Sequence, residues 1–235
     1  MMSAFRFKQF EVSQEKSALK VGTDAVVLGA MMTLPETDNS ILLDIGTGTG
    51  VIALMAAQRL SGTAGYHITA IDIDGPSALE AADNFAASHW NGHLEAVHSS
   101  LQNFSTDHFY DAIFSNPPFY DDSLRNPDCR EAAARHTGSL SYNDILTFAA
   151  SHLDSGTLSL ILPAEEEIRL RRTAASFGLL PFRIVRIRTT GGKKPRRILA
   201  EFRKNGGPLS EEEITLQNGS ARAEAYARLT ADFYL

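Results

Sequence analysis

Cysteine is almost absent from this chain, because Cys129 is the only one in 235 residues. A single thiol permits neither an internal disulfide nor a cysteine-rich metal site. Residues 1–12 lack the apolar stretch of a secretory signal, and no apolar run approaches the ~20 residues needed to cross a bilayer. We therefore expect a cytoplasmic protein with no membrane partner.

Metal-ligand spacing is also missing from the seven histidines, so we expect no metal ion. Positive charge is scarce early in the chain, where five basic residues precede Asn116, and the net charge is −6. That average argues against a nucleic-acid partner, since Lys and Arg supply most of the affinity for phosphates. However, nine basic residues lie within residues 183–204, so the charge is polarised along the chain.

From residue 41 onward, short apolar runs alternate with segments of helical spacing. This alternation is typical of a parallel sheet with crossover helices on both faces, the α/β class. Seven strands are predicted, at residues 41–45, 67–71, 94–98, 111–115, 158–162, 182–188 and 197–202. Helices are predicted at residues 24–32, 51–60, 76–88, 142–153 and 165–177, with a closing helix at 221–234.

No helix is predicted between the last two strands, whose link contains Gly191 and Gly192. They should therefore form an antiparallel hairpin at one edge of a mostly parallel sheet. Residues 213–216 are a further strand candidate. The length fits a single domain over residues 1–235, monomeric by preference, with residues 1–34 as an N-terminal cover on the ligand site.

A glycine-rich loop follows the first strand of the sheet. It contains Gly46, Gly48 and Gly50, and Asp44 precedes it. Glycines let the backbone turn tightly and approach a ligand closely. The Gly-x-Gly-x-Gly spacing differs from that of a dinucleotide cradle, and an acid at the entrance would repel a diphosphate while binding an ammonium group. The loop therefore favours S-adenosylmethionine as cofactor.

The second and third strands end in further candidates for cofactor contacts. Asp72 stands where a carboxylate accepts hydrogen bonds from both ribose hydroxyls, and Ile73 offers an apolar surface to the adenine. Asp74 is better interpreted as a helix cap. At the end of the third strand an Asp is expected to reach the adenine amine, but Ser100 stands there instead, so either Ser100 or a backbone group makes this contact.

The fourth strand leads directly into Asn116, Pro117, Pro118 and Phe119. The lone pair of an exocyclic amine is delocalised into its ring. The side-chain oxygen of Asn116 and the carbonyl of Pro117 can accept hydrogen bonds from such an amine, and two prolines hold the loop rigid. Phe119 can stack on a base taken out of its own stack. These four residues are the predicted catalytic site, with Asn116 also beside the cofactor.

Basic residues outside this site are candidates for RNA contact. Arg125, Arg130 and Arg135 follow the catalytic residues in a long connection without clear periodicity. Lys193, Lys194 and Arg196 lie in the predicted hairpin, where ordinary solvation explains the charge about as well as RNA contact does.

Motifs outside the sheet resemble those of the bacterial tRNA(Val) adenine N6-methyltransferases. They include Phe-Lys-Gln-Phe at residues 7–10, Leu-Lys-Val-Gly-Thr-Asp at 19–24, Ala-Glu-Ala-Tyr at 223–226 and Phe-Tyr-Leu at 233–235. The resemblance spans nearly the whole chain. It implies a class I (Rossmann-like) methyltransferase that acts on the adenine 3′ of the anticodon. By the same likeness Lys20, Gly22, Thr23 and Asp24 cover the methionine end of the cofactor.

Two groups of alternatives stay open. A related amine methyltransferase would act on a guanine amine of ribosomal RNA or on a protein glutamine amide, although the chain has no room for a large recognition domain. A binding module that kept the fold without turnover is the alternative from another class. The intact sequence at residues 116–119 argues against it.

Overall fold

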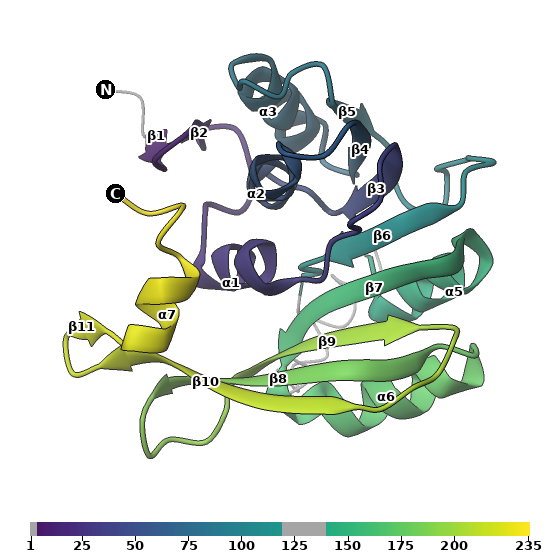
Figure 1. The fold of residues 1–235 in the computed structure, drawn as a ribbon. Coiled ribbons are helices and arrows are strands. Elements are labelled where there is room, and N and C mark those ends of the chain that lie inside the picture. Colours follow the sequence, from purple (N-terminus) through teal and green to yellow (C-terminus); the bar gives the residue numbers. More distant parts are fainter. Residues whose placement is uncertain (1–3, 119–139) are drawn as a thin grey trace, which may run out of the picture.

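A sheet of nine strands forms the centre of the structure, a computed structural model that describes residues 4–118 and 140–235 (Figure 1). Its strand order is β11-β10-β8-β9-β7-β6-β3-β4-β5. The strands are β3 (Ser40–Ile45), β4 (Tyr66–Asp72), β5 (Leu94–His98), β6 (Tyr110–Ser115), β7 (Leu153–Pro163), β8 (Leu180–Thr190), β9 (Arg197–Arg203), β10 (Ser210–Asn218) and β11 (Ala221–Arg222). All are parallel except β9 and β11, so the carboxyl ends of the other seven share one edge.

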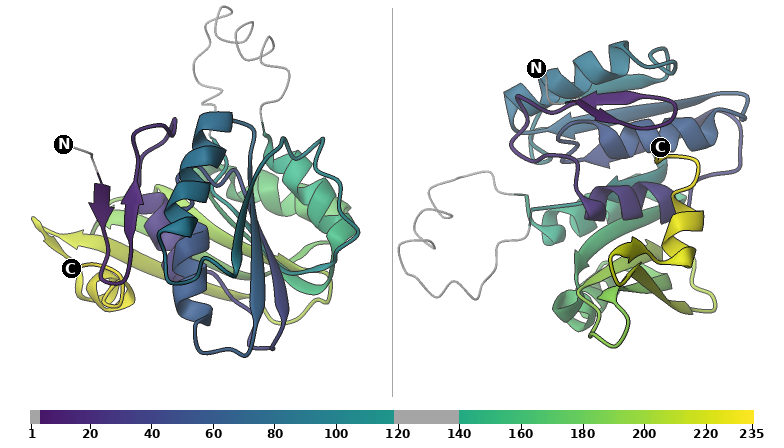
Figure 2. Two further views of the ribbon diagram at one scale, coloured as in Figure 1. Left: turned by 90° about the horizontal axis from the view of Figure 1, so that it is seen from above. Right: turned by 90° about the vertical axis from the view of Figure 1, so that its left-hand side faces the viewer.

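Helices cover both faces of this sheet (Figures 1 and 2). On one face lie α1 (Thr23–Met31), α2 (Val51–Leu60) and α3 (Gly75–Ala86), and on the other α5 (Tyr142–His152) and α6 (Glu167–Ser176), which follows the short 3₁₀ helix η1 (Ala164–Glu166). Successive strand residues therefore enter different cores: Leu42 packs with the first group of helices and Leu43 with the second.

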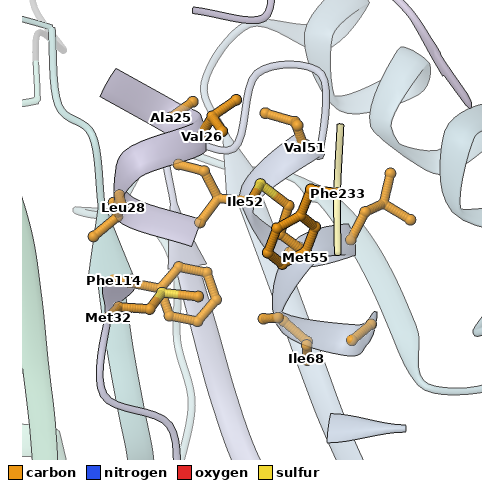
Figure 3. Close-up of a cluster of buried hydrophobic side chains, with 14 of the residues drawn as sticks. Ala25, Val26, Leu28, Met32, Val51, Ile52, Met55, Ile68, Phe114 and Phe233 are labelled. Carbon is orange, nitrogen blue, oxygen red and sulfur yellow. The ribbon is translucent and has the colours of Figure 1, made fainter. Parts of the chain in front are cut away.

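The core beneath α1 and α2 fixes the position of the glycine-rich loop. Figure 3 shows Leu28 of α1 and Met55 of α2 packed over Ile68 and Phe114 of the sheet. Gly29 allows this close approach, because an added Cβ would lie 2.7 Å from the sulfur of Met55. The start of α2, and with it the loop that precedes it, is thereby held against the sheet.

The two ends of the chain pack against each other. A hairpin of β1 (Ala4–Arg6) and β2 (Glu11–Ser13) lies beside the C-terminal segment after α7 (Glu224–Leu229). The amide of Lys8 donates to the carbonyl of Phe233 at 2.8 Å, and the rings of Phe7 and Tyr234 stack at 6.0 Å. In the described part of the chain, no helix is long and apolar enough to cross a membrane.

All seven predicted strands are present, and the antiparallel hairpin is β8 with β9. Two further strands extend this sheet: β10, which contains the strand candidate at 213–216, pairs with β8 in parallel, and β11, which was not predicted, pairs with β10. The closing helix predicted at 221–234 is wrong at both ends, because α7 spans only Glu224–Leu229. Asn218 and Ala221 face each other across a tight turn in which Gly219 has a φ of +61°, so the chain makes a hairpin before α7 begins.

Candidate active site

A cavity of about 300 Å³, here called the cofactor cavity, opens at the carboxyl ends of β3, β4, β5 and β6. The cavity is lined by residues that follow separate strands, namely Gly46, Gly48, Asp72, Ile73, Ser100, Asn116 and Pro118. Ala18 and Leu19 of the N-terminal segment and Leu140, shortly before α5, also line it. The sequence predicted the residues from the strand ends as parts of one site. The sheet explains their proximity, since parallel strands end at a common edge.

The glycine-rich loop is tied to β4 and faces open space. The amides of Gly46 and Thr47 both donate to the carbonyl of Ile71, at 2.9 and 3.0 Å. Gly48 has a φ of +56°, and a Cβ added there would meet nothing within 4 Å. This glycine is therefore required by the backbone conformation, and the space beside it is available to a ligand.

Gly50 lies where α2 packs against α3. It precedes α2 with a φ of +81°, and an added Cβ would lie 2.5 Å from the ring of Phe85 in α3. It does not line the cofactor cavity. The packing of α2 against α3 accounts for this glycine, while a cofactor contact stays a prediction.

Asp44 lies beneath the loop and is fully buried. Its Oδ2 accepts a hydrogen bond from the hydroxyl of Thr47 at 2.7 Å, but its Oδ1 has no hydrogen-bond partner. Burial raises the pKa of Asp44 to about 7, and the nearby charge of Asp72 acts in the same direction. An unpartnered buried carboxylate oxygen is costly, and a cationic group of a ligand would satisfy it.

Asp72 lines the cofactor cavity from the end of β4. Its Oδ2 accepts from the amide of Gly48 at 2.8 Å and its Oδ1 from the amide of Asp74 at 2.9 Å. Burial raises the pKa of Asp72, and these two hydrogen bonds oppose the rise. Each carboxylate oxygen accepts more than one hydrogen bond, so Asp72 keeps acceptor capacity for a pair of hydroxyls. Asp74 caps α3 by accepting from the amide of Ser77, as predicted.

Apolar side chains form the far wall of the cavity. Ile73 is 50% exposed and Leu19 is 63% exposed, which is unusual for side chains of this size, and Leu101 and Leu140 complete the surface. Ser100 lines the same wall, and its hydroxyl accepts from the amide of Asn103 at 3.3 Å. These contacts fit the edges and faces of a planar ring.

The N-terminal segment is clamped over this wall by α3. Glu80 accepts hydrogen bonds from three successive amides, those of Glu15, Lys16 and Ser17, at 2.7 to 2.9 Å. Asn84 bonds to both the amide and the carbonyl of Ser13, and also donates to the carbonyl of Thr49. The cover and the glycine-rich loop are therefore attached to the same helix.

Three residues of the site were not predicted from the sequence, namely Glu80, Asn84 and Leu19. Glu80 and Asn84 stand in no motif or spacing that indicates a ligand site, and Leu19 looks like an ordinary apolar residue of its segment. The residues predicted to cover the methionine end lie elsewhere. Lys20 and Gly22 are exposed and outside the cavity lining, and Thr23 and Asp24 line a second cavity. Gly22 has a φ of −119°, which any residue adopts. Cofactor contacts by these four residues stay predictions.

The predicted catalytic residues begin where β6 ends. The hydroxyl of Ser115 donates to the carbonyl of Ile45 at 2.6 Å, which fixes the end of β6 beside the end of β3. Asn116 and Pro118 line the cofactor cavity, whereas Pro117 is buried. Phe119 lies outside the described residues. Asn116 thus shares a cavity with Asp72 and the glycine-rich loop.

Most arginines of the β8–β9 hairpin are paired with acids. Arg183 binds Glu212 and Glu201, Arg186 binds Glu167, and Arg188 binds Glu213, all at 3.1 Å or less. Lys193, Lys194 and Arg196 stand at the turn of the hairpin and are exposed. Arg125, Arg130 and Arg135 lie outside the described residues. Among the described residues, no group of three or more His, Cys, Asp or Glu is placed to hold a metal ion.

Comparison with known proteins agrees with this geometry. The family described as "Methyltransferase small domain" matches residues 16–138. A predicted O-methyltransferase from Agrobacterium tumefaciens is 15% identical, with a TM-score of 0.65 over 89% of this chain and 96% of that one. A methyltransferase from Pyrococcus furiosus is 21% identical, with a TM-score of 0.56 over 83% and 90%. The fold is that of the class I methyltransferases, which use S-adenosylmethionine.

Full-length relatives define the family more narrowly. A tRNA1(Val) (adenine(37)-N6)-methyltransferase of Bacteroides fragilis is 38% identical over 98% of this chain and 97% of its own length. One of Vibrio vulnificus is 34% identical over 98% and 95%. The chain belongs to the tRNA1(Val) (adenine(37)-N6)-methyltransferase family and is a methyl-transferring enzyme.

Proposed function

We propose that the enzyme transfers a methyl group from S-adenosylmethionine to N6 of an adenine in tRNA, namely the adenine 3′ of the anticodon of tRNA(Val). The observation that carries this proposal is the position of Asn116 in the cofactor cavity, together with Asp72 and Gly48. The names of the full-length relatives support the choice of tRNA and of position 37.

The described residues fit the proposed cofactor. Asp72 would accept hydrogen bonds from the ribose hydroxyls, and Ile73 with Leu101 would pack on the adenine ring, since these residues and Ser100 line the same cavity. Asp44 is buried beneath the loop, outside the cavity lining, and its unpartnered Oδ1 would accept a hydrogen bond from the ammonium group. Residues 1–34 act as a cover, which Glu80 holds in place through the amides of residues 15–17. The bound cofactor supplies an electrophilic methyl group on a sulfonium.

Asn116 and Pro117 then make the amine a competent nucleophile. Their oxygens accept hydrogen bonds from the two N–H groups, which turns the lone pair away from conjugation with the ring and toward the methyl group. Because the prolines fix the backbone, little rearrangement is needed at the moment of reaction. The methylated nitrogen carries a positive charge and loses its proton readily, so no strong general base is required. Phe119 stacks on the base that has left the anticodon loop.

The proposed substrate also bears on where the enzyme acts and in what oligomeric state. An unpaired anticodon-loop base is easily splayed out, so it can reach Asn116 in the cofactor cavity. With tRNA as substrate, we propose that the enzyme acts in the cytoplasm, and as a monomer.

Replacing Asn116 tests the mechanism directly. Asn116→Ala should bind S-adenosylmethionine within about twofold of wild type in calorimetry, yet transfer methyl groups to a tRNA(Val) transcript at least about 100-fold more slowly, the usual cost of losing one preorganised contact to the reacting group. Asn103→Ala is the matched control, because Asn103 is exposed and outside the cavity lining. Equal turnover in the two variants would refute the role of Asn116.

A further inference from the structure

A second cavity, of about 400 Å³, lies apart from the cofactor cavity. The elements that surround it are the start of α1, the turn between β8 and β9, the end of β10 and the C-terminal segment; α7 lies beside α1 in Figures 1 and 2. Arg196, Arg197, Arg222, Tyr226 and Tyr234 carry its chemistry. It is called the arginine–tyrosine cavity below.

This cavity opens at the same edge of the sheet as the active site. Ile187 and Thr189 belong to the carboxyl end of β8, and Leu216 and Gln217 to that of β10. Both strands run parallel to β3 and β6, whose ends lead into the glycine-rich loop and the predicted catalytic residues. One short segment joins the two cavities, since Leu19 lines one and Thr23 the other. Four residues span at most about 14 Å.

The charge of the cavity is positive and only partly neutralised. Three guanidinium groups and one carboxylate, that of Asp24, line it. Arg197 binds Asp24 at 2.7 Å, which leaves Arg196 and Arg222. Within the described ranges 4–118 and 140–235, no carboxylate forms an ion pair with either of them. The arginines of β8 are by contrast paired with glutamates of β10.

Aromatic rings add a second kind of contact. The guanidinium of Arg222 lies 4.0 Å from the centre of the Tyr234 ring, and the hydroxyls of Tyr226 and Tyr234 are 3.3 Å apart. Burial raises the pKa of Tyr226, so its hydroxyl stays protonated and able to donate a hydrogen bond. Guanidinium groups bind phosphates, and arginine planes and aromatic rings stack on unpaired bases.

We propose that the arginine–tyrosine cavity binds one nucleotide of the RNA substrate, with Arg196 and Arg222 on its phosphate and the stacked Arg222–Tyr234 pair beside its base. This site would hold the RNA a few nucleotides from the adenine at Asn116. The inference rests on the proposed function, because it takes the substrate to be tRNA.

The test compares tRNA binding by the wild type and by the double variant R196A/R222A, using fluorescence anisotropy over a range of salt concentrations. The variant should bind a tRNA(Val) transcript about tenfold more weakly, and the slope of log K against log salt should fall in magnitude by about 1 to 2, because one or two phosphates are no longer neutralised by an arginine. R196K/R222K keeps both charges and should restore the salt slope, but only part of the affinity, because lysine does not form the planar stack of Arg222 on Tyr234. Arg172→Ala, which removes an exposed charge from α6 on the opposite face, should change neither quantity.

Calorimetry with S-adenosylmethionine should show equal affinity for all these variants, which separates an RNA defect from a cofactor defect. Unchanged tRNA affinity and salt slope in R196A/R222A would overturn the assignment even if the wild type methylates tRNA normally. If the double variant loses saturable binding of AMP but binds tRNA like the wild type, the cavity is a site for a free nucleotide and the proposal is wrong. A wild type that transfers no methyl group to tRNA would refute the proposed function itself.

Discussion

The carboxyl group of Asp44 lies beneath the glycine-rich loop with no exposure to solvent and with one oxygen unpartnered. Burial raises its pKa to about 7 in the free protein. A cationic ligand stabilises the ionised form and lowers that pKa again. The proposed contact with the ammonium group of the cofactor would therefore couple the ionisation state of Asp44 to cofactor binding.

This coupling predicts how cofactor affinity depends on pH. Binding requires the ionised carboxylate, so the association constant for S-adenosylmethionine should rise nearly tenfold per pH unit below about pH 7 and level off above it. Calorimetry in buffers of different ionisation enthalpy should detect proton release at pH values just below that pKa. Asp44→Asn should flatten this profile and weaken binding. A wild-type profile as flat as that of the variant would contradict the role of Asp44.

The same group makes a prediction for stability. A pKa raised on folding means that the carboxyl group favours the folded state below the unfolded pKa and that this contribution is lost as pH rises through about 7. At about pH 8, Asp44→Asn should therefore raise the melting temperature of the cofactor-free protein by roughly 5 °C, since one kcal/mol shifts Tm by a few degrees in a chain of this size. An unchanged or lower Tm in thermal unfolding at that pH would show that the buried charge is compensated.

The helix α3 holds the backbone amides of residues 15–17 of the N-terminal segment through a single side chain, that of Glu80. Glu80 is 2% exposed and receives three backbone hydrogen bonds from residues 15–17, next to Ala18 and Leu19 of the cavity wall. Burial alone would raise the pKa of Glu80, but the hydrogen bonds together lower it, so the carboxylate stays charged and holds the amides firmly.

Loosening this clamp should weaken cofactor binding. Glu80→Gln replaces one acceptor oxygen by a donor, and we expect about a tenfold loss of S-adenosylmethionine affinity, the effect of about 1.4 kcal/mol, with kcat at saturating cofactor nearly unchanged. Hydrogen exchange should rise at residues 14–21. Asp83→Asn is the control, because it removes only the exposed ion pair with Lys16, and exposed pairs contribute little. Normal affinity in Glu80→Gln would show that the cover is not held by this residue.

The elements also show what the sequence predicts well. The helix at 51–60 and the strand at 94–98 match the structure residue for residue, because hydrophobic period and glycine boundaries determine them locally. The strand β11 was not predicted and the helix that contains α7 was predicted too long, since Asn218 and Gly219 were not recognised as a hairpin turn. The shared position of Asp72 and Asn116 on one cavity could be predicted, because the ends of parallel strands place them there. The role of Glu80 could not be predicted, because its partners are 63 to 65 residues away.

The net charge of the molecule does not show how its basic residues are distributed. A net charge of −6 would suggest no RNA partner, yet glutamates of β10 and of α6 neutralise the arginines of β8. The charge left over at the sheet edge belongs to Lys193, Lys194, Arg196 and Arg222, on the side of the molecule where Asn116 lies. The two chain ends pack against each other, and the amide of Lys8 donates a hydrogen bond to the carbonyl of Phe233.

If the proposed function holds, tRNA(Val) in the cell carries N6-methyladenosine only when this gene is present. Nucleosides from purified tRNA(Val) of a strain lacking this gene should be measured by mass spectrometry, alongside the same strain carrying the wild-type gene or the Asn116→Ala variant. N6-methyladenosine should be missing from the tRNA of the strain that lacks the gene. The wild-type gene should restore it, and the Asn116→Ala variant should not. Undiminished N6-methyladenosine in the strain without the gene, or its restoration by Asn116→Ala, would contradict the account.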